Sequence, residues 1–207
     1  MYVPQHFAVT DEAELHAHIA AARVGNLITV NGGVVNATLI PFLLDAESGE
    51  RGTLIGHIAK ANPQWENLDP AFEALVVFSG PDAYVSPSTH PSKRAGGKVV
   101  PTWNYVAVHA YGTIRPIHDG QRKREIVAEL SEHHERNRED PWAITDAPEN
   151  YISSILQSIV GIEISLTRII GKAKLSQNRS EQDRLGVIDD LTTGRFPNDG
   201  AVAAYMR

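Results

Sequence analysis

The middle of the chain contains a long strand-like run, residues 97–112, which continues through Ile117. Val, Thr, Trp and Tyr recur along it, and these residues suit a pleated, half-buried surface. Hydrogen-bonding side chains stand among them, more than a purely structural strand requires: Lys98, Thr102, Asn104 and His109. Either a polar ligand docks on this run, or it is an ordinary antiparallel strand with one wet face.

Hydrophobic periodicity divides the rest of the chain into strands and helices. Asp11 and Glu14 form a variant capping box at the start of a helix, and Asn31-Gly32-Gly33 is a hairpin turn. The expected strands are residues 26–30, 34–44, 53–58, 74–79, 82–86 and 162–166, and the expected helices are residues 11–23, 119–138, 146–160 and 180–191. Short strands interrupted by a helical pair indicate an antiparallel barrel with helical additions.

The domain organisation follows from the same pattern. We expect one domain over residues 1–193, with a helical insertion at about 119–160 and a peripheral tail over 194–207. The segment 86–97 is rich in Pro, Ser and Gly and predicts an irregular loop.

Composition excludes several functional classes. The chain lacks cysteine, so disulfides, thiolate nucleophiles and zinc-thiolate sites are excluded, which fits a reducing compartment. No apolar run approaches the roughly 20 residues that span a bilayer, and the N-terminus does not resemble an export signal. We therefore expect a cytoplasmic protein that does not contact a membrane. The formal net charge of -6 argues against a large nucleic-acid surface, although a local basic patch is compatible with it.

Two places combine polar groups in patterns that suit an anion. Asn36 and Thr38 share one face of an expected strand, where they either hold a phosphate or ring carbonyl or face solvent. His57 and Lys60 precede Asn62-Pro63, a helix-start signal. A cation beside free helix N–H groups favours anions, whereas a solvated loop lysine is the structural alternative.

Six words occur in order along the chain: GTLIGHIAKANPQW, AYVSPS, PSK, GKVVPTWNY, IVGIEI and GKAKLSQNR. Their order and spacing resemble the PaiB-type family of FMN-binding negative transcriptional regulators, and the likeness runs from Tyr2 to about Leu191. It implies an α+β fold, an antiparallel split β-barrel of the FMN-binding type with peripheral helices. It also implies a homodimer with flavin sites at the subunit interface. The chain departs from the pattern at Thr89-His90, where an aromatic pair is expected.

The resemblance implies FMN as the cofactor and a set of residues that bind it, with a degenerate, empty pocket as the alternative. The residues are Asn36, Thr38, His57, Lys60, Asn62, Thr102, Trp103, Asn104, Lys172, Lys174, Gln177 and Arg179. Lys60, Lys174 and Arg179 would neutralise a phosphate. Thr and Asn side chains would donate to phosphate or pyrimidine oxygens, and Trp103 would cover an isoalloxazine face or pack across the dimer.

Three functions remain open at this point. The first is a flavin-binding negative regulator, for which direct DNA contact has weak support from the charge; a local patch of Arg122, Lys123, Arg124, Arg136 and Arg138 is its best candidate. The second is a flavin-dependent oxidoreductase, in which the cofactor supplies the chemistry and no residue is obligatory as acid or base. The third is a haem-binding split barrel that uses one of the nine histidines.

The histidines do not predict a metal site. His16 and His18 lie two positions apart on an expected helix, and His133 and His134 are adjacent, so neither pair shares a helical face. His57 and His109 lie on expected strands, where a hydrogen-bonded structural role competes with a role at a cofactor.

Overall fold

The structure is a computed structural model that describes residues 1–207, apart from the side chain of Ala95. The chain forms two compact units. The first unit contains residues 1–18, 79–108 and 170–207, and the second contains residues 19–78 and 109–169. Each unit is described by itself below.

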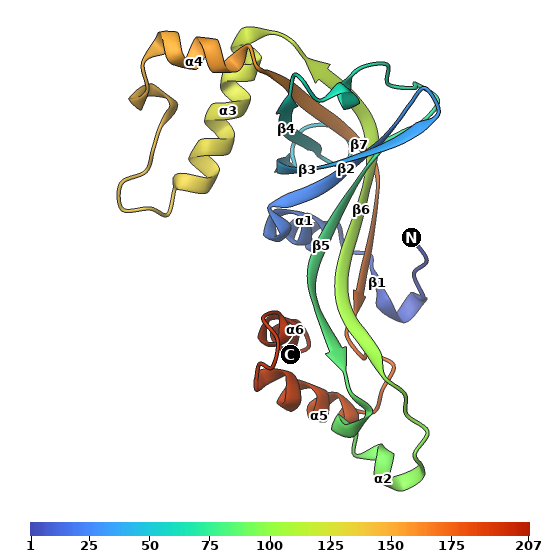
Figure 1. The fold of residues 1–207 in the computed structure, drawn as a ribbon. Coiled ribbons are helices and arrows are strands. Elements are labelled where there is room, and N and C mark those ends of the chain that lie inside the picture. Colours follow the sequence, from blue (N-terminus) through green and yellow to red (C-terminus); the bar gives the residue numbers. More distant parts are fainter. The chain divides into compact units, whose positions relative to one another are not determined.

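The second unit is built on an antiparallel sheet that closes on itself (Figure 1). The strands are β2 (Val24–Asn31), β3 (Val34–Asp45), β4 (Thr53–Ala59), β5 (Ala74–Val85), β6 (Thr102–Ile117) and β7 (Ile159–Lys174). Their order is β7-β4-β3-β2-β5-β6, and a further pairing of β6 with β7 completes the ring. Gly112 permits this closure, because a Cβ at that position would collide with the carbonyl of Ser165.

One helix covers part of the second unit's sheet, and a second helix packs on the first. α3 (Gly120–Glu135) starts at Asp119, whose carboxylate accepts a 2.8 Å hydrogen bond from the Arg122 N–H, and it packs Ile126 and Leu130 against Ile55. α4 (Glu149–Leu156) follows the 3₁₀ turn η4 (Ile144–Asp146). The Lys123 ammonium donates to the last carbonyl of α4, Leu156, at 2.6 Å, which satisfies a helix end that has no internal partner.

The first unit combines ends of the long strands with small helices. β1 (Ala8–Val9), after the 3₁₀ turn η1 (Gln5–Phe7), pairs with β7 through Ala8 and Lys172. α5 (Glu181–Thr192) packs on α6 (Asp199–Tyr205), and Val187, Leu191 and Val202 are buried there. η3 (Pro87–Thr89) and α2 (Ser92–Gly96) are held to α5 by Asp183, which accepts from Ser92 N at 3.1 Å and from Ser92 Oγ at 2.8 Å.

Most expected elements are present, and the first helix is confirmed. α1 (Glu12–Ala22) buries Leu15 and Ile19, and Asp11 caps it by accepting from Glu14 N at 3.0 Å. The hairpin of β2 and β3 turns at Gly32 and Gly33, both of which have positive φ. Asn62 starts the 3₁₀ turn η2 (Pro63–Trp65) as expected, since its side chain accepts from Gln64 N.

Several boundaries were wrong. β5 is one strand across Gly80-Pro81 rather than two, because Gly80 lies closely against Val106 and does not turn the chain. The expected loop 86–97 contains η3 and α2, since Ser86 caps one turn and Asp183 fixes the other. α4 ends at Leu156 instead of Gly161, and β7 extends to Lys174.

The tail is not peripheral. Three of its side chains are at most 2% exposed: Val202, Ala203 and Met206. The packed face of α6 therefore belongs to the core of the first unit. The single-domain boundary at residue 193 stays a prediction. No helix in the described chain is long and apolar enough to cross a membrane.

Candidate functional site

The residues that the resemblance implicates lie in both units. The second unit contains Asn36, Thr38, His57, Lys60 and Asn62. The first unit contains Thr102, Trp103, Asn104, Lys172, Lys174, Gln177 and Arg179. The environment of each group shows which side chains are free to bind a ligand.

In the second unit, three of the residues belong to one polar network around Gln64. Asn62 Nδ2 donates to Thr38 Oγ1 at 2.9 Å, and Thr38 Oγ1 donates to Gln64 Oε1 at 2.5 Å. Gln64 is 2% exposed and donates to the carbonyls of Leu27 and Asn36, at 2.9 and 3.3 Å. The amide and hydroxyl groups therefore bind one another and fix η2 against β2 and β3.

Asn31 completes this network. Its Nδ2 donates to the Gln64 carbonyl at 2.9 Å, and its Oδ1 accepts from Thr29 Oγ1 at 2.7 Å and from Asn36 Nδ2 at 3.3 Å. The sequence did not reveal the roles of Asn31 and Gln64, because neither belongs to a periodic face. The network is closed, so its main role is to hold the fold.

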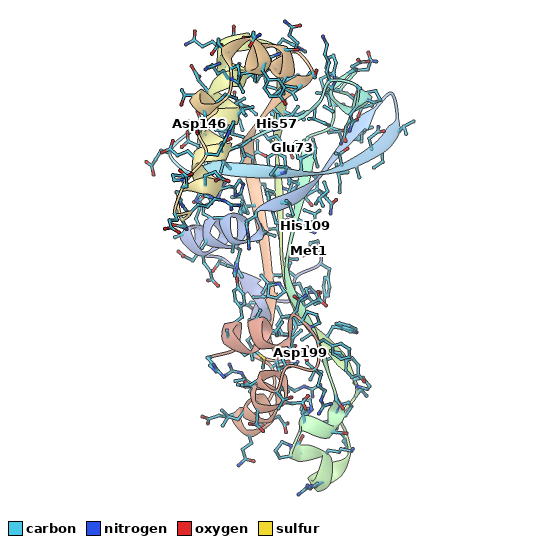
Figure 2. The ribbon with its side chains drawn as sticks, turned by 60° about the vertical axis from the view of Figure 1, so that its left-hand side comes forward. Met1, His57, Glu73, His109, Asp146 and Asp199 are labelled. Atoms are coloured by element: carbon cyan, nitrogen blue, oxygen red, sulfur yellow. The ribbon has the colours of Figure 1, made fainter. Side chains whose placement is uncertain are left out.

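His57 and Lys60 are separate from the network. Phe42 pairs with Gly56, so alternation places His57 on the sheet face opposite Thr38, towards a 300 Å³ pocket with Ser131, His134 and Trp142 (Figure 2). Burial lowers the pKa of His57, which keeps its imidazole neutral at pH 7. Lys60 is exposed, and among the described side chains none pairs with its ammonium.

The first unit gathers three cations, which we call the cation cluster: Lys172, Lys174 and Arg179. The Lys174 ammonium donates to Thr102 Oγ1 at 2.5 Å and to the Trp103 carbonyl. Both ammonium groups lie over the Tyr105 ring, with Lys172 Nζ 5.1 Å and Lys174 Nζ 5.9 Å from its centroid. The sequence did not single out Tyr105.

The charge of the cation cluster is not balanced by any acid among the side chains that the structure describes. Burial lowers the pKa of Lys174, and the positive charges of Lys172 and Arg179 lower it further. Among the described side chains, no carboxylate forms a salt bridge with any of the three. Lys172 is only 8% exposed, so this positive charge is partly desolvated without a counter-ion. Such an arrangement binds an anion well, because the ligand relieves the mutual repulsion.

Two further predicted residues hold the cluster in place. Asn104 is fully buried and exchanges hydrogen bonds with Ser176 Oγ, at 3.0 and 3.2 Å. Gln177 accepts from Leu175 N at 2.7 Å and donates to the Ala173 carbonyl at 2.6 Å. Both side chains are engaged with the turn after β7, so they position Lys174 and Arg179 and have little capacity left for a ligand.

Trp103 lies beside the cation cluster and is half exposed, at 52%. Its ring meets Tyr84 edge to face, with the centroids 5.8 Å apart. Both rings line a groove of 380 Å³ whose other wall comes from Phe196 and Pro197, between α5 and α6. The sequence did not predict this groove, because Tyr84 and Phe196 are more than a hundred residues apart.

Comparison with known proteins supplies the family. The model described as "Putative FMN-binding domain" matches residues 1–168. The chain belongs to this FMN-binding family. It is also 33% identical to "Protease synthase and sporulation protein PAI 2" of Bacillus subtilis over 206 residues, which cover 100% of this chain and 96% of the relative. An uncharacterized protein of Emericella nidulans is 38% identical over 186 residues, covering 75% of this chain and 74% of that protein.

The solved structures agree on the fold. The flavocytochrome Anf3 from Azotobacter vinelandii superposes with a TM-score of 0.59 at 16% sequence identity, covering 89% of this chain and 78% of that chain. The predicted α+β fold, an antiparallel split β-barrel with peripheral helices, is confirmed. The family match ends at residue 168, before the lysines and arginine of the cation cluster, whereas the Bacillus relative aligns through them.

Proposed function

We propose that this protein binds FMN and that the cation cluster of the first unit holds the phosphate. The observation that carries the proposal is the group of three cations, partly buried, without a carboxylate partner among the described side chains. A phosphate dianion meets the chemical requirement of such a cluster. Lysine contributes point charges, and arginine can bind two phosphate oxygens at once.

Groups around the cation cluster suit other parts of FMN than its phosphate charge. The Thr102 hydroxyl lies within the hydrogen-bonding reach of Lys174, at 2.5 Å, so both can address the same oxygen-rich group. Tyr105 supplies aromatic surface close to the cations, because the ammonium groups of Lys172 and Lys174 lie over its ring. When bound, the flavin ring supplies redox chemistry, and the protein's part is to bind and orient it.

The second unit contributes less to this proposal. The amides and hydroxyls of the Gln64 network are used within the fold, so they do not meet the needs of a phosphate. Lys60 is exposed, has no partner among the described side chains, and remains a candidate contact of its own. We therefore rank Lys174 and Arg179 above Asn36, Thr38 and Asn62 as ligands.

We further propose a regulatory role, exerted by a homodimer whose flavin state alters the binding of a partner. The Bacillus relative is named a protease synthase and sporulation protein, and the resemblance to the PaiB-type family of negative transcriptional regulators supports a regulatory role for this chain. Exposed apolar side chains on β3, Val34, Val35 and Leu39, favour an interface between two copies. Direct DNA contact through α3 is disfavoured, because Arg122 pairs with Glu129 and Glu163, and Arg124 with Glu149.

Titration with FMN tests the cofactor. Purified protein is titrated with FMN, FAD and haem while flavin fluorescence and absorbance are recorded. We expect FMN to bind, and Lys174→Gln and Arg179→Gln each to weaken it by about tenfold or more, since a charge-assisted hydrogen bond is worth roughly 1.5–3 kcal/mol. Arg195→Gln is the matched control, because Arg195 is a cation of the same unit that is already paired with Asp190 at 2.7 Å. Equal affinity in all three variants would refute the phosphate site.

A second experiment separates regulator from oxidoreductase. NADH or NADPH is added to the flavin-loaded protein under anaerobic conditions and the flavin absorbance is followed. Slow or absent reduction, together with flavin-dependent binding of a partner or promoter, supports the regulator. Rapid multiple turnover would instead identify a flavin-dependent oxidoreductase. The mass of the protein in solution, measured by light scattering at several concentrations, tests the homodimer.

A further inference from the structure

The first unit has a second surface feature, which is the 380 Å³ groove between β5, β6 and the α5–α6 connection. We call it the aromatic groove; its aromatic walls are Tyr84, Trp103 and Phe196. These rings are 40%, 52% and 63% exposed, so a contiguous set of large apolar side chains faces solvent in a concave site. Monomeric proteins seldom leave such surfaces uncovered without a function.

Two carboxylates line the same groove. Asp199, at the start of α6 (Figure 2), is only 3% exposed, and its Oδ2 accepts from Phe196 N at 2.9 Å. Asp82 is exposed and lies 3.5 Å from the side-chain amide of Asn198. Among the described side chains, none of Lys, Arg or His lines the groove or forms a salt bridge with either carboxylate.

Together these groups specify the charge of a ligand. The Asp199 carboxylate is stabilised by the Phe196 N–H and by its place in the first turn of α6, so the exposed Asp82 is the carboxylate of the groove that is left to meet a cation. The faces of Trp and Tyr rings carry negative potential and attract organic cations, to an extent that grows when the site is desolvated. A small metal ion would not use the aromatic walls, whereas a cation with an apolar body uses both the walls and the carboxylates.

We propose that the aromatic groove binds an organic cation with an apolar body, of the alkylammonium class. The ammonium lies against Trp103 and Tyr84 with Asp82 at the rim, and Phe196 covers its apolar part. This binding is distinct from that of the flavin phosphate, because it requires the opposite charge. It does not rest on the proposed function, since no part of it uses the cation cluster.

The test uses a charged probe and its neutral isostere. Choline and 3,3-dimethylbutan-1-ol have the same shape, but only choline carries a charge. Binding to the whole chain is measured by tryptophan fluorescence and by calorimetry. We expect choline to bind and the alcohol to bind about tenfold more weakly, which corresponds to about 1.4 kcal/mol and lies within the range of a partly desolvated cation–π contact.

Substitutions test whether choline binds in the aromatic groove. Trp103→Leu and Asp82→Asn should each weaken choline by severalfold or more, while Trp142→Phe, at an exposed tryptophan of the second unit, should not. Circular dichroism verifies that each variant is folded. Absence of choline binding, or equal binding of choline and the alcohol, overturns the proposal.

Competition distinguishes the groove from the flavin site. Choline affinity is measured again with saturating FMN. Retention of choline binding supports two sites. If FMN displaces choline completely and Trp103→Leu abolishes both, the groove belongs to the flavin ring and the proposal is overturned; the FMN proposal itself survives that result.

Discussion

The cation cluster and the aromatic groove belong to the same unit of the protein and carry opposite, uncompensated charges. The cluster brings Lys172, Lys174 and Arg179 together without an acid, and the groove brings Asp82 and Asp199 together without a base. A folded chain that needed only stability would have paired them, since nearby opposite charges favour their ionised forms. Their separation is what the two proposals explain, since a ligand of opposite charge would complete each site.

The second unit treats its charges differently. Arg122 binds Glu125, Glu129 and Glu163, at 3.2, 2.8 and 2.8 Å. Burial opposes ionisation of Glu163, but hydrogen bonds and charge from Arg122 and Arg115 outweigh it and lower the pKa of that carboxyl. Here a charged side chain that joins two elements is paired with a side chain of opposite charge. The cation cluster and the carboxylates of the aromatic groove lack such pairs, which makes them candidate ligand sites.

Reversal of one charge in the cation cluster should have the largest effect on ligand binding. Lys174→Glu should weaken FMN binding by about a hundredfold or more, because truncation of one partner of a desolvated pair costs roughly 2–5 kcal/mol and a like charge adds repulsion. Fluorescence titration at fixed ionic strength measures the effect. A loss no greater than that of Arg195→Glu would show that the cluster does not meet the phosphate.

Removal of the amide beneath the cluster tests whether position matters apart from charge. Asn104→Ala leaves the Ser176 hydroxyl buried without its partner, so we expect a loss of about 1–3 kcal/mol in the free energy of unfolding. Urea denaturation measures it. If Asn104 contacted FMN directly, FMN affinity would fall in Asn104→Ala even under conditions in which circular dichroism shows the variant to be fully folded.

Neutralisation of a carboxylate in the aromatic groove tests whether negative charge there binds the organic cation. Asp82→Asn should weaken choline by about three- to tenfold, the range of a partly exposed charge contact, and should leave FMN affinity unchanged or slightly raised. Asp140→Asn, at an exposed acid of the second unit, is the control. Equal losses in the two variants would mean that only the overall charge of the protein matters.

Alkaline pH should weaken FMN binding but not choline binding, by a smaller factor than the substitutions above. The pKa of Lys174 is lowered, so its ammonium loses the proton earlier than an ordinary lysine as the pH rises. FMN binding favours the protonated form; affinity is therefore full below the lowered pKa and falls severalfold through it. Choline keeps its charge, and its affinity should stay constant over the same range. Parallel declines would indicate unfolding, which circular dichroism at each pH detects.

Much of the local structure was readable from the sequence. Capping at Asp11, the turn at Gly32-Gly33 and the face shared by Asn36, Thr38, Ile40 and Phe42 depend on neighbours within a few positions, and all are present. The resemblance also indicated the two lysines of GKAKLSQNR, Lys172 and Lys174, which the structure gathers with Arg179.

Contacts between distant segments were not readable. Asn104 meets Ser176 and Met206, and Tyr84 shares a groove with Phe196; no period in the sequence links these positions. The Pro-Ser-Gly composition of residues 86–97 favoured a loop, but the carboxylate of Asp183, on α5, orders part of it as a helix. Propensity describes the segment alone, and tertiary partners decide the outcome.

Trp103 belongs to both sites, since its carbonyl accepts from Lys174 and its indole lines the groove. With both sites occupied as proposed, the anion and the cation would attract each other across this shared residue, so occupation of either site would favour occupation of the other. Thermodynamic reciprocity then applies: the factor by which the organic cation tightens FMN equals the factor by which FMN tightens the organic cation. Under the two proposals, a single strand residue would make flavin binding depend on the concentration of an alkylammonium ion.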